Sequence, residues 1–379
     1  MKCPRCQQAR FCLQCGQGVA AGMGISRRRV AQGRVKEYPH EAQARADPMG
    51  RRAFIRRMAL GGVAGLLGLR PESAAAEPPP ETTRLRVHHS LSLCQAPQYV
   101  AEDLLRGEGF TEVQYVPHGP KGFYETLGSG EADIGGDFAT SVIIQLDRGT
   151  PIVVLGGIHV GCFELFGTEQ VRTIRDLKGK TVGVRGLDTP PHIFLSTMAA
   201  YVGLDPRRDI IWVTHPSDES MRLLGRGEID AFMGFPPEPQ ELRAKRIGHV
   251  VVNSAVDRPW SQYFCCMSIA NRDFARKYPV ATKRALRAIL KATDICALEP
   301  ARAAKSLTAQ GLTKRYDYAL QTMKDVPYTK WRNYDPEDAI RFYALRLNEI
   351  GMIKSNPQKI IAQGTDWRFF NELKRELKT

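Results

Sequence analysis

The chain has 379 residues, of which 43% are hydrophobic and 25% charged, and its formal net charge is +14. This composition is that of a globular protein, and the length is sufficient for two hydrophobic cores. Residues 1–76 hold 14 Lys and Arg against 4 Asp and Glu, whereas residues 77–379 hold 40 against 36. The positive charge is therefore concentrated near the N-terminus, and nothing in the remainder predicts a nucleic-acid partner.

Residues 49–76 have the organisation of an export signal. Arg51 and Arg52 open a basic segment, and the uncharged run 58–69 that follows is too short to span a bilayer permanently. Three alanines at 74–76 then supply a small-residue cleavage site. The adjacent arginines resemble those of twin-arginine signals, so we expect a periplasmic protein. An amphipathic or membrane-anchoring helix is the alternative.

Residues 1–48 precede this signal, although an export signal normally opens its chain. We therefore expect translation to start at Met49 and residues 1–48 to be a mis-assigned extension. The extension nevertheless contains two C-x-x-C pairs, a spacing that can hold zinc. Because little chain separates the pairs and nothing nearby could fold over a metal, zinc is the less favoured interpretation. The four cysteines concerned are Cys3, Cys6, Cys12 and Cys15.

Strand and helix patterns alternate after the signal. The first series has expected strands at 84–88, 113–116, 132–135 and 152–158, and helices at 97–106, 122–127 and 140–146. The second has strands at 181–184, 210–213, 229–233, 249–252 and 262–269, and helices at 190–202 and 238–245. Ser217 is expected to cap a further helix, which ends at the stretch Leu224–Asp230. From 274 onwards the pattern is almost entirely helical, over 274–297, 299–308, 315–323, 335–350, 356–363 and 366–377. The alternation predicts an α/β protein with mainly parallel sheets.

One motif occurs in both series. Leu127–Asp133 recurs, slightly altered, 97 positions later as Leu224–Asp230. The pattern is that of a helix end, a turn and a buried strand, and Gly130 and Gly227 stand where a left-handed residue is needed. A repeat of this length predicts two similarly built lobes with a cleft between them. Chance similarity between two helix-to-strand turns is the alternative.

Ligands of open parallel sheets bind beyond the carboxyl ends of the strands. The loops concerned are 89–97, 136–140, 186–192 and 234–238, with the crossover 159–163 as a fifth. Two of these loops follow the repeated motif directly. We therefore expect Asp137 and Phe138 to face Phe235 and Pro236 across the cleft.

The stretches 127–135, 176–184 and 227–231 resemble the solute-binding proteins of nitrate, sulfonate and taurine uptake transporters, a group that includes the SsuA/THI5-like and NMT1-like domains. The resemblance extends over about 84–379. It implies the type II periplasmic-binding-protein fold, with lobe 1 formed by 84–158 plus 267–379 and lobe 2 by 159–266. Hinge crossings at both ends of lobe 2 would fall near 159–164 and 260–266. It also implies a protein that closes on a small solute and delivers it to an ABC permease in the membrane. We expect a monomer without a cofactor.

The resemblance does not identify the ligand, whose class has to be inferred from the residues of the expected cleft. Anion-binding members use a loop before a helix N-terminus, but in the matching loop Asp188 would repel an anion and Pro190 lacks an N–H. Carboxylates and aromatic rings at the expected cleft favour a flat nitrogen heterocycle, such as a thiamine-precursor pyrimidine, over sulfonate, taurine or nitrate. The candidate ligand-binding residues are Ser92, Gln95, Asp137, Phe138, Thr140, His159, Cys162, Leu187, Thr189, His192, Phe235, Glu238, Tyr263 and Cys265.

Two other functions stay open. THI5-like relatives include pyrimidine synthases with a Cys-rich motif, which Tyr263–Cys266 resembles incompletely, and His159, Cys162 and His192 would then suit a thiol nucleophile or a metal site. An export signal argues against such an enzyme, and we expect no catalytic residues. A periplasmic sensor that docks onto a receptor is the second alternative. The five cysteines beyond the signal are expected to be buried, unpaired side chains, one of which could line the cleft: Cys94, Cys162, Cys265, Cys266 and Cys296.

Overall fold

The computed structural model describes residues 77–90, 92–117 and 122–378. The chain divides into two units at residues 75 and 76, and all the described helices and strands belong to the second unit. The expected export signal at 49–76 and the extension 1–48 lie outside the described residues, as do Cys3, Cys6, Cys12 and Cys15. Within the described ranges, no helix combines the length and the apolar character that crossing a membrane requires.

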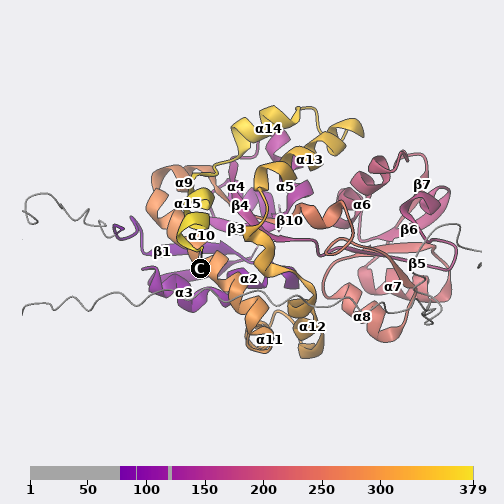
Figure 1. The fold of residues 1–379 in the computed structure, drawn as a ribbon, viewed down its shortest axis with the longest axis horizontal. Helices are drawn as coiled ribbons and strands as arrows, with labels where there is room; N and C mark the ends of the chain where they lie inside the picture. The colour runs from indigo at the N-terminus through magenta and orange to yellow at the C-terminus, as the bar shows by residue number, and fades with distance from the viewer. Residues whose placement is uncertain (1–76, 91, 118–121, 379) are drawn as a thin grey trace, which may run out of the picture. The chain divides into compact units, whose positions relative to one another are not determined.

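The described chain forms two five-stranded sheets in which equivalent strands stand in the same order. The first sheet has the order β2 (Glu112–Val116), β1 (Arg84–His88), β3 (Ile134–Phe138), β10 (Phe264–Asn271), β4 (Ile152–Val160). The second has the order β7 (Ile210–Thr214), β6 (Lys180–Val184), β8 (Ala231–Gly234), β5 (Glu164–Gly167), β9 (His249–Asn253). Figure 1 labels β1, β3, β4 and β10 of one sheet and β5, β6 and β7 of the other. This arrangement confirms the predicted two-sheet α/β class.

Each sheet is mixed, although the alternation of strands and helices predicted mainly parallel pairing. In the first sheet β1 pairs in parallel with β2 and β3, but β10 pairs antiparallel with β3 and β4. In the second sheet β6 is parallel to β7 and β8, and β5 is antiparallel to β8 and β9. The antiparallel strands are the two through which the chain enters a sheet after crossing from the other one.

The helices cover the sheets and extend the C-terminal half. Those that alternate with strands are α2 (Ala96–Val100), α3 (Glu102–Gly107), α4 (Phe123–Gly128), α5 (Ala139–Asp147), α6 (Pro190–Tyr201), α7 (Ser217–Arg226) and α8 (Glu238–Lys245). Those after β10 are α9 (Arg272–Lys277), α10 (Pro279–Leu298), α11 (Pro300–Ala309), α12 (Tyr316–Asp325), α13 (Pro336–Glu349), α14 (Pro357–Gly364) and α15 (Arg368–Glu376). Short 3₁₀ turns are η1 (Leu93–Gln95), η2 (Ile174–Leu177), η3 (Trp260–Gln262) and η4 (Tyr328–Arg332).

The late helices pack against elements of both sheets. Helix α13 contacts α5 and α6, and α12 contacts α8. Arg243 of α8 forms ion pairs with Glu164 of β5 and Asp325 of α12. On α13, the ring of Phe342 stacks on Tyr263, with centroids 4.0 Å apart. The C-terminal helices therefore join elements of the two sheets.

The two segments that connect the sheets are hydrogen-bonded to each other. Ser254 Oγ accepts from the backbone N–H of Phe163 at 2.9 Å and donates to the carbonyl of the same residue at 2.8 Å. Gly161 has a φ of +38°, and a Cβ there would lie 2.2 Å from the Ser254 carbonyl oxygen. Only glycine permits this approach of the two crossing segments.

The turn of the repeated motif has the predicted conformation in both copies. Gly130 has a φ of +79° and Gly227 a φ of +71°. Gly227 caps the C-terminus of α7, and its N–H donates to the carbonyl of Leu224 at 3.0 Å. Glycine adopts this left-handed conformation without the steric cost of a Cβ, which explains its place in each copy.

The aspartate that ends each copy also has the same role in both sheets. Asp133 accepts the backbone N–H of Arg86 in β1 at 2.7 Å and forms an ion pair with its guanidinium. Asp230 accepts the backbone N–H of Thr181 in β6 at 2.9 Å and lies 3.6 Å from the Lys180 ammonium. The motif therefore joins its turn to the first parallel strand of each sheet.

Candidate ligand-binding site

A cavity of about 430 Å³ lies where the carboxyl-end loops of the two sheets meet. Its volume is in the range of small-molecule sites. From the side of the first sheet it is lined by His88, His89, Ser90, Ser92, Phe123, Gly136, Asp137 and Phe138. From the side of the second sheet it is lined by Arg185, Thr189, Pro190, Pro191, Phe235, Pro236, Pro237 and Glu238.

Aromatic rings from the two repeats meet at this cavity. Phe138 ends β3 and Phe235 follows β8, and their ring centroids are 5.0 Å apart. The buried ring of Phe163, in the crossing segment, lies 4.8 Å from Phe138 and 5.8 Å from Phe235. The cavity thus has an apolar aromatic surface of the kind against which a flat ligand can pack.

Two carboxyl groups complement this surface. Asp137 accepts a 2.6 Å hydrogen bond from the Tyr124 hydroxyl, and burial raises its pKa to about 6 despite that bond. Glu238 is buried, which raises its pKa although Arg185 lies 3.0 Å from its carboxylate. Glu238 also accepts the backbone N–H of Phe235 at 3.1 Å. Asp137 can therefore change protonation state near pH 6, and burial makes Glu238 harder to ionise than an exposed carboxyl group.

The loop before α6 is poorly suited to binding an anion. Pro190 and Pro191 occupy the first two positions of the helix, so neither supplies an N–H. The Thr189 hydroxyl donates to the Gly186 carbonyl at 2.6 Å. Arg185, whose orientation the strand pattern left open, faces the cavity but is paired with Glu238. The donors and charge that an anion would need are thus largely absent or engaged at this loop.

Six of the fourteen residues predicted from the sequence line the cavity: Ser92, Asp137, Phe138, Thr189, Phe235 and Glu238. Leu187 and His192 line a second cavity of about 490 Å³ instead. His192 Nδ1 accepts the backbone N–H of Asp188 at 3.0 Å, its ring contacts Trp212, and burial lowers its pKa. The side chains of Leu187 and His192 do not line the first cavity because the loop turns at Asp188, which has a φ of +60°.

The remaining six predicted residues do not line the cavity. Gln95 and Thr140 are buried, 1% exposed each. Tyr263 is stacked on Phe342 of α13. His159, Cys162 and Cys265 belong to a buried cluster of sulfur and imidazole groups beside the crossing segment. Sequence position placed all six near the right strand ends, but side-chain direction was not accessible from it.

Several cavity residues were missed by the sequence reasoning. His88 ends β1 and lines the cavity, whereas the loop expected from the sequence begins one residue later, at His89. Its ring contacts Phe123, at 4.1 Å between centroids, and Phe123 itself opens α4. The signal that could have found His88 is its position at the carboxyl end of β1, whereas Phe123 lies at the start of a helix and carries no such signal.

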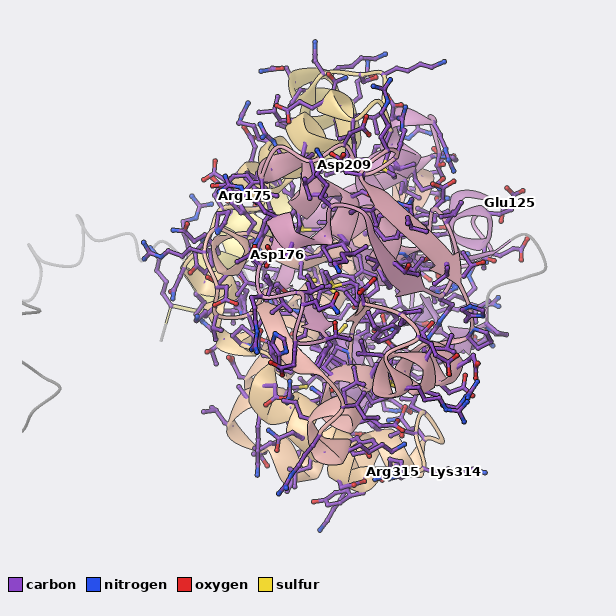
Figure 2. The ribbon with its side chains drawn as sticks, turned by 90° about the vertical axis from the view of Figure 1, so that its right-hand side faces the viewer. Glu125, Arg175, Asp176, Asp209, Lys314 and Arg315 are labelled. Atoms are coloured by element: carbon purple, nitrogen blue, oxygen red, sulfur yellow. The ribbon has the colours of Figure 1, made fainter. Side chains whose placement is uncertain are left out.

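The motif residue Asp176 has a structural role. Its carboxylate accepts the backbone N–H groups of Arg172 at 3.0 Å and Thr173 at 2.8 Å, which caps η2. Those hydrogen bonds lower its pKa. Asp176 lies at the surface near Arg175 (Figure 2), and it does not line the cavity.

Two sheets with the same strand order, and a cavity where their carboxyl-end loops meet, define a periplasmic-binding-protein fold. Among solved structures, the periplasmic nitrate-binding protein NrtA from Synechocystis PCC 6803 has a TM-score of 0.64 at 12% identity, covering 79% of this chain and 90% of that one. The alkanesulfonate-binding protein SsuA from Xanthomonas axonopodis pv. citri, bound to MOPS, has a TM-score of 0.58 at 17% identity, covering 77% and 100%. These likenesses show the fold.

The chain belongs to the NMT1/THI5-like family, whose model matches residues 97–303, more than half of its length. Curated relatives include the 4-amino-5-hydroxymethyl-2-methylpyrimidine phosphate synthase THI5 of Saccharomyces cerevisiae, 24% identical over 260 residues that cover 65% of this chain and 71% of the relative. The enzyme of the same description from Uromyces fabae is 27% identical over 207 residues, covering 51% and 60%. The resemblance inferred from the motifs is thereby confirmed.

Proposed function

We propose that this protein is the exported solute-binding component of an ABC uptake transporter. In this role it captures a small nitrogen heterocycle, of the thiamine-precursor pyrimidine type, in the cavity between the sheets and delivers it to a membrane permease. The observation that carries the proposal is the meeting of Phe138, Phe235 and the carboxyl of Asp137 in one cavity built from both repeats. The fold shared with nitrate- and sulfonate-binding proteins supports it.

The chemistry of the cavity suits an aminopyrimidine. The ligand's ring would pack against the Phe138 and Phe235 rings. Its exocyclic amino group and adjacent ring nitrogen form a donor and acceptor edge that a carboxyl group can match with two hydrogen bonds. Asp137, with a pKa of about 6, matches that edge when it is protonated, since only the protonated carboxyl can donate to the ring nitrogen while accepting from the amino group.

Sulfonate, taurine or nitrate binding is the alternative within the same fold. It has less support because Pro190 and Pro191 remove N–H donors and Glu238 neutralises Arg185. Calorimetric titration of the protein with 4-amino-5-hydroxymethyl-2-methylpyrimidine, taurine and nitrate tests the choice. We expect saturable binding of the pyrimidine alone. Binding of taurine or nitrate with no pyrimidine signal would overturn the ligand class and leave the transport role in place.

The leader, the location and the assembly state form part of the proposal. We propose export through the twin-arginine-type signal at 49–76 and a monomeric periplasmic product. Fusing residues 49–76 to a reporter that is active only after twin-arginine export tests the first point. The matched control replaces Arg51 and Arg52 by lysine, which keeps the charge but should abolish export. Export that is unaffected by the double substitution would contradict the signal type.

A pyrimidine synthase is a second candidate, favoured by the names of the curated relatives. It predicts that the protein releases a pyrimidine phosphate without any added pyrimidine. Mass spectrometry of the small molecules formed during incubation of the purified protein with cell extract decides between the two functions. A product that accumulates with protein concentration would favour the synthase, whereas stoichiometric retention of an unmodified pyrimidine would favour the transporter component.

A further inference from the structure

Four metal-ligating side chains converge beside the segment that leaves the first sheet. Cys94 comes from η1, His159 from β4, Cys162 from the crossing segment and Cys266 from β10. One potential ligand atom from each lies within 4.8 Å of the other three. All four residues are buried, with at most 5% of any of them exposed. Four separate segments therefore deliver one sulfur or nitrogen atom each to the same small volume.

The spacing fits a tetrahedral thiolate site. With Zn–S bonds of about 2.3 Å, two sulfurs of a tetrahedron are about 3.8 Å apart. Cys94 Sγ and Cys266 Sγ are 3.9 Å apart. Three cysteines and one histidine form a common ligand set of closed structural zinc sites.

The histidine is oriented as metal-binding histidines are. His159 Nδ1 lies 3.1 Å from the carbonyl oxygen of Val160, and a carbonyl can only accept, so Nδ1 carries the proton. The lone pair is then on Nε2, which is buried and has no hydrogen-bond partner among the described residues. A backbone carbonyl that fixes the tautomer and leaves the other nitrogen for a cation is the usual outer partner of a ligating histidine.

Cys265 lies beside the cluster but outside the ligand set. Its Sγ is 3.0 Å from Cys162 Sγ. The pairing of β10 with β4 is irregular between Phe264 and Cys266, where two steps on β10 match one step on β4. This bulge at Cys265 brings it close to the same group as Cys266, whereas regular alternation would direct the two neighbours to opposite faces.

We propose that Cys94, His159, Cys162 and Cys266 bind one zinc-class cation. As the metal enters, each of the three thiols releases its proton to solvent and forms a metal–sulfur bond, and neutral His159 donates its Nε2 lone pair. The site replaces the combination of His159, Cys162 and His192 considered from the sequence, because His192 lines the second cavity. The proposal is independent of the ligand proposed for the main cavity.

The position of the site gives the metal a mechanical role. Cys162 belongs to the crossing segment, whereas His159 and Cys266 belong to paired positions of the first sheet. A bound cation would fasten the start of the crossing segment to that sheet. Ser92, which lines the ligand cavity, has its Oγ 3.1 Å from Cys94 Sγ, so the metal site would also position one edge of the cavity.

Cobalt(II) titration of the full-length reduced protein tests the site, because tetrahedral cobalt–thiolate sites absorb strongly in the visible range. We expect these bands to saturate at one cobalt per chain and to disappear when zinc is added. Cys162→Ser and Cys266→Ser should lose them, and His159→Gln should shift them. The controls Cys296→Ser, a buried cysteine of α10, and Cys265→Ser should keep the wild-type spectrum.

Two further experiments test the site without changing any of the four proposed metal ligands, so their results do not depend on whether such a variant folds. Cys3→Ser/Cys12→Ser should retain one cobalt in the buried site, and loss of all bands in this variant would place the metal at the N-terminal cysteines and overturn the proposal. Wild-type protein that gives no tetrahedral bands would also overturn it. So would non-reduced peptide mapping that finds a Cys162–Cys265 disulfide in protein purified without metal depletion.

Discussion

The ring of Phe138 lies 5.0 Å from the ring of Phe235, at an interplanar angle of 58°. Each phenylalanine follows its own copy of the repeated turn, and the two copies belong to different sheets. The contact therefore joins equivalent strand ends of the two sheets in the lining of the cavity. It also makes the aromatic surface sensitive to any change in the distance between the two sheets.

Phe235→Ala should weaken binding of the proposed pyrimidine about tenfold, because it removes roughly 1.4 kcal/mol of ring packing. Leu187→Ala is the matched control, since Leu187 is 58% exposed and lines the second cavity. Isothermal titration of both variants provides the measurement. Equal losses of affinity would place the ligand outside the cavity between Phe138 and Phe235.

Asp137→Asn should change how stability depends on pH. The folded-state pKa of about 6 is above the unfolded value of about 4, so the folded protein binds this proton more tightly. The carboxyl's stabilising contribution is therefore complete below about pH 4 and is lost as the pH rises through 6, by up to about 3 kcal/mol. Urea unfolding between pH 4.5 and 7.5 should show that the free energy of unfolding of the variant increases relative to that of wild type as the pH rises.

The control for this titration is Asp103→Asn, an exposed aspartate of α3. Its stability should follow wild type across the same pH interval. A constant difference between Asp137→Asn and wild type over that interval would mean that Asp137 does not titrate there.

The equivalent aspartates of the repeat should contribute unequally to stability. Asp133→Ala leaves the Arg86 N–H and guanidinium without their carboxylate in a site where the aspartate side chain is 4% exposed, at a cost of about 3 kcal/mol. The side chains of Asp230 and Lys180 are each 27% exposed, so Asp230→Ala should lower the free energy of unfolding by only about 1 kcal/mol. Chemical denaturation measures both values, and a larger loss for Asp230→Ala would contradict the argument from burial.

Two glycines near the end of α7 should respond in opposite directions. Gly227→Ala forces a Cβ into a left-handed position with a φ of +71° and should destabilise the protein by about 1 kcal/mol. Gly225→Ala lies within the helix, where a Cβ would make an ordinary 3.5 Å contact with Ile247, and should stabilise it by about 0.5–1 kcal/mol. Thermal unfolding of the pair checks the sign of each change.

The sequence was informative where a backbone position or a periodicity determines the structure. The left-handed Gly130 and Gly227 were predicted because only glycine is comfortable there. Helix α8 was predicted at the observed bounds Glu238–Lys245, since prolines precede it and a glycine follows soon after. The strand β3 extends to Phe138, three residues beyond its expected end, because its final positions still pair with β10.

Side-chain direction explains most of what the sequence did not predict. Cys265 was expected as a cleft residue, but the bulge in β10 turns it toward Cys162. Leu187 and His192 follow the left-handed Asp188 into the second cavity. Strand order likewise depends on contacts between distant segments, so the antiparallel placement of β5 and β10 was not visible in local patterns.

The placement of β10 has a consequence for biosynthesis. Strand β4 is at the edge of the first sheet, and within the described chain its one neighbouring strand is β10, which is made more than a hundred residues later. In the second sheet the position equivalent to that of β10 is held by β5, which is made before both strands that pair with it, β8 and β9. The second sheet can therefore be completed once β8 and β9 have been made, whereas the first sheet stays incomplete until Asn271 has been synthesised. Ribosome-bound chains that end before β10 should expose the apolar strand β4 and depend on chaperones during that interval.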